Sequence, residues 1–376
     1  MRVIPPFPIV STNPNNPASS YPAVWTCNIP ENPTLWSSAT TYAVNDIVRY
    51  NAGVPNIRSQ YRSLQAGNLN HTPSSSPTWW KYIADEYVNW DSAITYSVGN
   101  IVSSELYHRV YQSLVNSNLN NDPLDTTKWM DIGPTNSTAS IQLAQSVKTR
   151  ANVPIIYTIE PNVGFNFNSI ALFGLWATSV NIKIANSATP TTYFYDNTIT
   201  LTPTNYDWLA YGPWKKGDAG PLYKENIVLW DLPTGTDVII TITITNTADT
   251  SDLLRTKVGS IILGEYVDIG GAEYGALNDS LNFSTISRSF DGTIDSIVKR
   301  RNIPRNNYTV YAPSTSIRKL LMLRKILTAE IAGWFGIDDY TLDQFDALSI
   351  LGLYKRFTIN VDQQDRVRID LEIEEA

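Results

Sequence analysis

The sequence has few of the residues on which enzymes and disulfide-stabilised proteins depend. Its 376 residues contain one cysteine, Cys27, two histidines and only 17% charged residues. A single cysteine excludes an intramolecular disulfide and leaves the redox compartment open. No run of about 18 apolar residues occurs, so no membrane span is expected. The net charge of −7 argues against a general nucleic-acid-binding protein.

The scarce reactive residues are not spaced for catalysis or metal binding. His71 and His108 fit no metal-ligand spacing, and Cys27 lies among prolines without a neighbouring histidine. A glycosidase needs two carboxylates that face each other, and the spacing of the acids in this sequence indicates no such pair. The aspartates between 338 and 346 suit the first turn of a helix better than a cation site. We therefore expect no enzymatic activity and no cofactor or metal.

The most informative feature is a segment that occurs twice, in residues 35–83 and 89–132. Both copies contain a Trp, a Tyr, alternating valines, a Tyr-x-Ser-Leu strand, an Asn-Leu-Asn-x2-Pro turn and a closing Trp. The matching positions are Trp36 and Trp90, Tyr42 and Tyr96, Val44 and Val98, Tyr61 and Tyr111, Asn68 and Asn118, and Trp79 and Trp129. Internal repeats indicate units that fold alike. The alternation predicts two small β modules, residues 34–84 and 85–136.

The order of these aromatic residues resembles the carbohydrate-binding modules of families 5 and 12, which are chitin-binding appendages of secreted chitinases. The resemblance implies a small β fold and contact with glycans. The Lys-Trp-Trp or Lys-Trp-Tyr cluster with which those modules stack on sugars is replaced here by Arg62-Ser63-Leu64 and Gln112-Ser113-Leu114. The fold is therefore expected without the usual chitin site. A secreted protein of the chitinase type is expected to carry an export signal. Residues 1–8 are too short and too rich in proline to be the apolar core of such a signal.

The repeat aromatics divide into core and surface candidates. Trp36, Tyr42, Trp90 and Tyr96 recur beside alternating valines, so we predict that they close a small core. The candidate glycan or subunit contacts are Trp79, Trp80 and Trp129. Adjacent residues of a strand point to opposite faces, so one of Trp79 and Trp80 should seal the module and the other should be free. Because Trp79 matches Trp129 by spacing, Trp80 is predicted to lie outside.

The chain around the repeats divides into further segments. Residues 1–33 carry eight prolines and predict an extended arm that could clasp a neighbouring subunit. Residues 134–140 read as a polar linker. Short apolar strands without helical period then predict a β-sandwich over 137–280, with strands near 169–175, 178–184, 226–232, 237–245 and 258–264. This pattern resembles galactose-binding-like jelly-rolls.

Residues 281–376 predict an α+β domain that makes subunit contacts. A helical period runs over 316–331, a short helix is expected over 341–348, and residues 353–361 and 366–374 predict a hairpin. Charge is segregated, with nine Lys or Arg against two acids in 286–325 and eleven acids against four bases in 330–376. We expect these charges to neutralise each other within the domain or between copies. The predicted fold class is therefore mainly β, with two repeat modules, a jelly-roll-like sandwich and a C-terminal α+β domain.

Roughly residues 165–376 are also similar to the C-terminal part of tailed-bacteriophage tail structural proteins. The resemblance rests on a loose Phe-Gly-Thr segment at 287–293, the basic residues 298–301, the strand at 351–357 and the closing residues 371–374. It implies a virion tail protein that is assembled in the host cytoplasm, contacts other phage tail proteins, forms a homo-oligomer and touches a host-surface glycan. The alternative is a secreted carbohydrate-binding adhesin or enzyme accessory protein.

Overall fold

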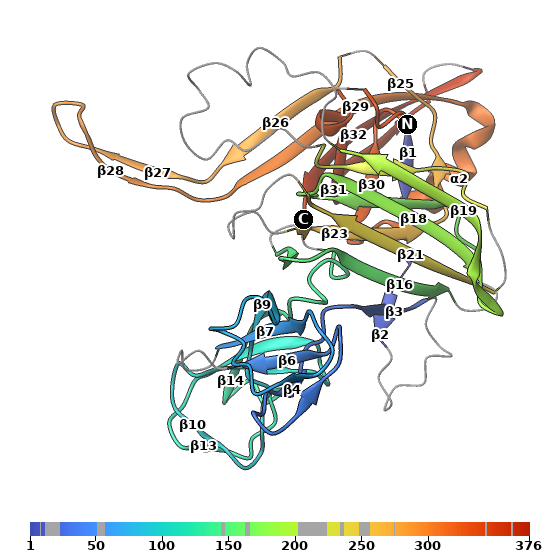
Figure 1. Cartoon of the computed structure of the whole chain (residues 1–376). Helices are drawn as coiled ribbons and strands as arrows, with labels where there is room; N and C mark the ends of the chain where they lie inside the picture. Colours follow the sequence, from blue (N-terminus) through green and yellow to red (C-terminus); the bar gives the residue numbers. More distant parts are fainter. Residues whose placement is uncertain are drawn as a thin grey trace.

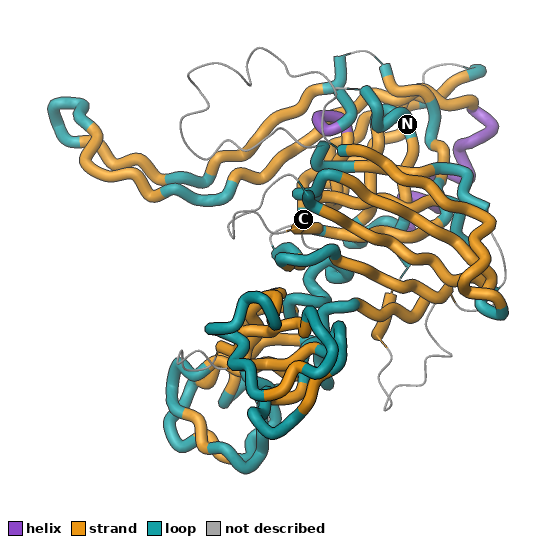
Figure 2. Tube along the Cα trace, viewed as in Figure 1, coloured by secondary structure: helices purple, strands orange, loops and turns teal. Residues whose placement is uncertain are grey.

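The computed structural model describes residues 1–7, 9–11, 23–50, 57–143, 147–161, 166–201, 224–233, 237–247, 256–273, 275–342, 344–361 and 364–376. The protein is mainly β, as predicted (Figure 2). Figure 1 shows three parts: a large body of packed sheets, a smaller pair of modules below it, and a long β-ribbon that leaves the body at one side.

The body contains three main sheets and a small one. The first has six strands in the order β19 (Thr189–Thr200), β18 (Ser179–Asn186), β21 (Val238–Thr245), β16 (Ile155–Pro161), β3 (Ala23–Cys27) and β2 (Ile9–Ser11). The second has three, in the order β20 (Ile227–Leu229), β17 (Ser169–Phe173) and β23 (Ser260–Gly264). The third is formed by β24 (Val267–Asp268), β1 (Arg2–Ile4), β30 (Ala332–Phe335), β31 (Ser349–Asn360), β32 (Arg366–Glu375), β29 (Asn302–Pro313) and β25 (Gly271–Ala272), with β26 (Leu277–Asn282) also paired to β29. A two-stranded pair joins β15 (Thr149–Ala151) to β22 (Thr256–Val258).

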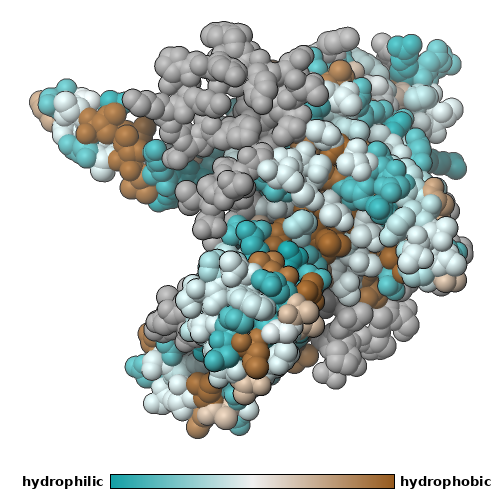
Figure 3. All heavy atoms as spheres, in the orientation of Figure 1, coloured by the Kyte–Doolittle hydropathy of each residue, from teal (hydrophilic) through white to brown (hydrophobic). Residues whose placement is uncertain are grey.

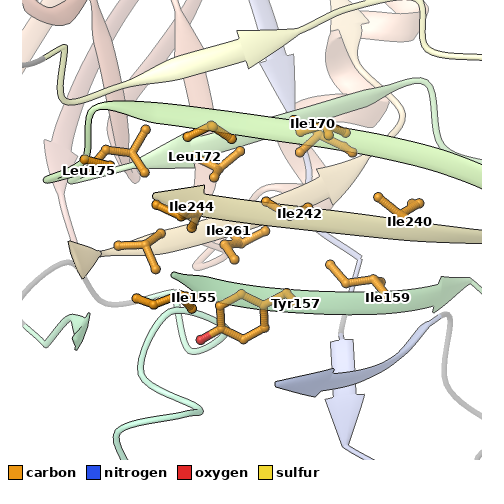
Figure 4. Close-up of a cluster of buried hydrophobic side chains, with 14 of the residues drawn as sticks. Ile155, Tyr157, Ile159, Ile170, Leu172, Leu175, Ile240, Ile242, Ile244 and Ile261 are labelled. Carbon is orange, nitrogen blue, oxygen red and sulfur yellow. The ribbon is translucent and has the colours of Figure 1, made fainter. Parts of the chain in front are cut away.

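The middle sheet is buried on both faces, which makes the body a three-layer structure. Along β17, Ile170 and Leu172 join the large core with the six-stranded sheet, whereas Ala171 and Phe173 join a second core with the eight-stranded sheet. Successive side chains of a strand point to opposite faces, so a continuous apolar strand is what a central layer requires. Figure 4 shows the large core, where isoleucines of β21 and β16 meet β17.

The predicted sandwich is present, but its boundary at residue 280 is wrong. The strands β24 and β25 precede that position and β26 spans it, and all three pair within the C-terminal sheet. The helix α2 (Ile317–Ile326) covers the outer face of this sheet through Leu320, Leu323 and Leu327. The hairpin predicted at the chain end is confirmed by the antiparallel pairing of β31 and β32.

Both predicted helices are shorter than expected. After a 3₁₀ turn η3 (Ser314–Ser316), α2 ends at Ile326 because the chain turns into the left-handed region at Ala329, whose φ is 62°. Over 341–348 only the 3₁₀ turn η4 (Asp346–Leu348) forms. There the carboxylate of Asp346 accepts from the backbone N–H of Asn226, so this aspartate joins two segments instead of capping a helix.

The N-terminal segment is not a separate arm. Its strand β1 lies between β24 and β30, with Val3 and Ile4 fully buried, and β2 and β3 extend the six-stranded sheet. Prolines at positions 5 and 6 fall between these strands, where no ladder hydrogen bond is needed. The segment therefore joins two sheets of its own chain. Residues 12–22 lie outside the described ranges.

Each repeat forms a compact β module. The first contains a four-stranded sheet of β4 (Thr34–Leu35), β6 (Ile47–Tyr50), β7 (Ile57–Ser63) and β9 (Trp80–Tyr87), with the small pair β5 (Thr41–Tyr42) and β8 (Asn68–Leu69). The second contains β11 (Ile101–Ser104), β12 (Arg109–Ser113) and β14 (Trp129–Pro134), with β10 (Thr95–Tyr96) and β13 (Asn118–Leu119). The repeats thus fold alike, as the sequence predicts.

The ribbon, which we call the hairpin arm, comprises residues 283–301. It continues the antiparallel pair of β26 and β29 as β27 (Thr285–Arg288) and β28 (Ile294–Val298), which pair with each other and with no other strand of the described ranges. Figure 1 shows the arm extending far beyond the body. No sequence pattern indicated this projection.

Candidate functional site

The core of each repeat is built around one tryptophan and one tyrosine. Trp80 and Trp129 are 2% and 1% exposed, and each meets its tyrosine, Tyr42 or Tyr96, edge to face with ring centroids 5.2 Å apart. Trp36 and Trp90 are half-buried against the same clusters. The predicted core roles of the four recurring aromatics are therefore confirmed.

The prediction that Trp80 lies outside is wrong. Trp80 pairs with Ser63, and Trp129 with Ser113, so these two tryptophans are the structural equivalents. The indole N–H of each donates to a backbone carbonyl, of His71 at 2.7 Å and of Asn121 at 3.1 Å. The turn that follows Pro73 is one residue longer than its counterpart, which shifts the spacing match from Trp80 to Trp79. Trp80 and Trp129 are therefore unavailable for surface contact.

Trp79 is the half-buried member of the three candidates. Its ring stacks on His71 with centroids 3.8 Å apart and planes 11° apart, and it packs beside the core of the first repeat. The equivalent position in the second repeat is Lys128: the carbonyls of Trp79 and Lys128 accept from Leu64 and Leu114 in the same way. The two repeats therefore do not present a matched pair of aromatic surfaces.

The Asn-Leu-Asn motif of each repeat has a structural role. Asn68 and Asn118 are buried, and each donates to a serine hydroxyl, of Ser63 or Ser113, at 3.0 Å. Asn70 and Asn120 adopt positive φ values of 57° and 56°, a conformation that asparagine tolerates better than most residues. The motif therefore fixes a turn, and the amides of Asn68 and Asn118 are used within the repeats.

The predicted linker 134–140 is a buried junction between the repeats and the body. Thr135, Ser137 and Ser140 are buried, and the Ser140 hydroxyl donates to the phenol oxygen of Tyr157 on β16 at 2.7 Å. The phenol of Tyr157 in turn donates to the Ser137 carbonyl at 2.8 Å. The polar composition of residues 134–140 predicts a solvent-exposed segment. In the structure these polar groups are buried and have hydrogen-bond partners in the interior.

Two glutamates organise this junction. Glu31 accepts from His108 Nδ1 at 2.9 Å, from Thr135 Oγ1 at 2.6 Å and from Ser137 Oγ at 2.8 Å. Glu86 accepts from the backbone N–H groups of Asn136 and Tyr87. Desolvation by burial raises the pKa of Glu86 to about 7. The junction thus connects the N-terminal segment, both repeats and the body through hydrogen bonds.

His108 and Cys27 are held in structural positions. His108 lies in the junction and its ring also contacts Trp25, with centroids 6.3 Å apart. Desolvation raises the pKa of the Cys27 thiol to about 12, which keeps it protonated at neutral pH. Neither residue is arranged as an activated nucleophile and base.

The segregated charges of residues 281–376 pair in part within the domain. Arg305 bridges Asp279 at 2.7 Å and Glu372 at 2.9 Å, and Arg301 meets Glu375 at 3.0 Å. Lys355 also pairs with Glu374 at 3.4 Å. These contacts fasten the root of the hairpin arm to the end of β32.

The arm itself exposes a row of large apolar side chains. Phe290 at its tip is fully exposed, and about half of each side chain is exposed at Phe283, Ile286, Ile294, Ile297 and Val298. In Figure 3 hydrophobic residues form a distinct patch on this projection. Contiguous apolar surface of this kind marks interaction sites.

Within the described ranges, no group of three or more His, Cys, Asp or Glu side chains is placed to hold a metal ion. The described part of the chain also contains no helix with the length and hydrophobicity that a bilayer crossing requires. Comparison with known proteins gave no matching family model and no matching curated protein.

Proposed function

We propose that this protein is a non-enzymatic structural component of a tailed-phage virion, located in the tail and present in several copies. In this proposal the body and arm make assembly contacts, and the two repeats act as a spacing or docking module. The chain would be assembled in the host cytoplasm with other tail proteins as partners.

The observation that carries the proposal is the hairpin arm. Two of the four segments that resemble phage tail proteins, residues 287–293 and 298–301, form its tip and base. An ordered projection with exposed isoleucines and phenylalanines suits a protein whose role is to contact other subunits. The buried junction supports a mechanical role as well, because it holds the repeats against the body through hydrogen bonds among Glu31, His108 and Thr135.

The test is the composition of purified particles. Mass spectrometry of virions from a strain that encodes this chain should detect it among the tail proteins, with genes for portal, tape-measure or other tail proteins beside its own. Its absence from particles that contain the other tail proteins would refute the proposal.

One observation favours a carbohydrate-binding adhesin or accessory protein as a second candidate. Trp79 is only partly buried and its ring is stacked on His71, so part of this aromatic pair remains accessible at the first repeat. Chitin and glycan pull-downs with the wild-type chain and Trp79→Ala would test this role. Binding that is lost in Trp79→Ala but kept in Lys128→Ala would support it, and no binding by the wild type would end it.

A further inference from the structure

The hairpin arm is amphipathic, although it has only two strands. Ile286 lies directly opposite Ile297, and Arg288 lies opposite Ile294, so these four side chains share one face. Ser287 lies opposite Ser296 on the other face, where their hydroxyls are 3.0 Å apart, and Thr285 lies opposite Val298 on that same face. The arm therefore has an isoleucine face, which also carries Arg288, and a serine face, which also carries Val298.

The isoleucine face has no partner among the described residues of its own chain. Ile286, Ile294 and Ile297 are 51%, 50% and 53% exposed, and every residue from Phe290 to Asn302 is exposed. A two-stranded ribbon is marginally stable at best in water, because it buries too little apolar surface. Such a face gains stability when a partner covers it.

Charge indicates a second copy of this chain as the partner. The arm has four basic and two acidic residues, a net charge of +2, whereas the whole chain carries −7, which leaves −9 on the rest of the molecule. A basic projection and an acidic body attract each other between copies, and long-range attraction of this kind favours encounter.

A fitting surface lies at the opposite edge of the same sheet. The arm extends from β26 and β29 at one side of the sheet, and β24 is the edge strand at the other side. Around β24, the half-buried rings of Trp230 and Tyr266 enclose the guanidinium of Arg2 at 4.9 and 4.5 Å from their centroids. The exposed acids of this surface are Asp231, Glu265, Asp268 and Asp338.

Two of these acids contact the residues of this edge directly. Asp338 pairs with Arg2 at 3.3 Å, and the Tyr266 hydroxyl donates to Asp231 at 2.8 Å. Two side-chain cations lie beside these carboxylates: Arg2 at Asp338, and Lys319, whose ammonium donates to the Asp268 backbone carbonyl at 3.3 Å. We call this surface the aromatic–acidic edge. It offers apolar rings to the isoleucines and carboxylates to Lys299 and Arg300.

We propose that the hairpin arm of one copy packs its isoleucine face on the aromatic–acidic edge of a neighbouring copy. The contact joins two different surfaces, so it is heterologous and generates a ring, or a filament where the rotation does not close. This inference rests on the proposed function, because it names the subunit contact by which the tail protein assembles.

Sedimentation velocity of the full chain tests the contact. The wild type is expected to form oligomers at tens of micromolar, and the triple variant Ile286→Thr, Ile294→Thr, Ile297→Thr to raise the dissociation constant at least tenfold. Threonine keeps the β-branched shape, so the ribbon itself is preserved. The matched control, Ser287→Thr with Ser296→Thr, alters the other face and should leave the dissociation constant unchanged.

A charge exchange tests the proposed partner surface. Lys299→Glu with Arg300→Glu should weaken assembly severalfold, and adding Glu265→Lys with Asp268→Lys in the same chain should restore it. Raising the salt concentration should weaken the wild-type contact, because exposed charges are screened within about 10 Å at 0.1 M. No recovery in the combined variant would overturn the assignment of this edge.

A photoreactive phenylalanine analogue at Phe290 identifies the neighbour directly. In a mixture of isotopically heavy and light chains, cross-links should join heavy to light and map to peptides containing Trp230 or Tyr266. A monomeric wild type, cross-links only within one chain, or arm-to-arm cross-links would overturn the proposal. Virion mass spectrometry stays independent: a monomer present in particles refutes the contact alone, whereas an arm-dependent oligomer absent from particles refutes the function alone.

Discussion

At the residue scale, the two repeats depend on one tryptophan each. We expect Trp80→Ala and Trp129→Ala to lower the free energy of unfolding by about 3–5 kcal/mol, because each removes a buried ring from a very small core. Trp79→Ala should cost less, since its side chain is only partly buried. Denaturant unfolding followed by near-ultraviolet circular dichroism measures the difference. Equal losses for Trp79 and Trp80 would contradict the assignment of Trp80 as the equivalent of Trp129.

The buried carboxyl of Glu86 predicts a pH dependence at the same scale. Its pKa rises from 4.5 to about 7 on folding, so the folded state holds a proton more tightly than the unfolded chain. The contribution of Glu86 to stability is therefore full below pH 4.5 and decreases as pH rises through 7. Glu86→Gln mimics the protonated side chain. The melting temperature of this variant should therefore change less with pH between 4.5 and 7 than that of the wild type. An unchanged profile would show that Glu86 does not titrate in this range.

At the scale of elements, the sequence predicts the strands well and the connections poorly. The Val-Ile-Ile-Thr-Ile-Thr-Ile-Thr run of β21 alternates strictly between buried and half-buried positions, which is why its pattern was readable. The predicted linker 134–140 is wrong because serine and threonine are equally suited to a solvated linker and to a buried hydrogen-bond network. The turn after Pro73 is one residue longer than the turn after Pro123. Spacing alone therefore does not show which of the two adjacent tryptophans is equivalent to Trp129.

The junction makes its own prediction for how the repeats are held. Glu31→Ala removes the acceptor shared by His108, Thr135 and Ser137, and the buried Ser137 hydroxyl loses the carboxylate to which it donates. Each unsatisfied buried group costs about 1–3 kcal/mol. We expect faster limited proteolysis between the repeats and the body, with both parts still folded. Glu105→Ala, an exposed acid of the second repeat, serves as the control and should cleave at the wild-type rate.

At the scale of the whole molecule, the N-terminal segment and the middle sheet turn a predicted chain of domains into one layered body. Strand pairing between residues 2–4 and residues 333–335 joins the two ends of the chain. Apolar strands such as β17 and β23 indicate burial, but sequence alone does not state how many layers cover them.

This layered packing predicts that the sandwich and the C-terminal sheet unfold together. Phe335 lies between them, with its ring 5.6 Å from Phe173 and 5.2 Å from Trp230 by centroid distance. Phe335→Ala should therefore cost about 3–5 kcal/mol and lower one calorimetric transition that both sheets share. Met322→Ala on the exposed side of α2 is the control and should shift that transition little. If Phe335→Ala instead splits the transition so that only the C-terminal sheet melts earlier, the two sheets are separate folding units. Two sheets that share one core lose its packing together, because the side chains of each sheet form the contact surface of the other.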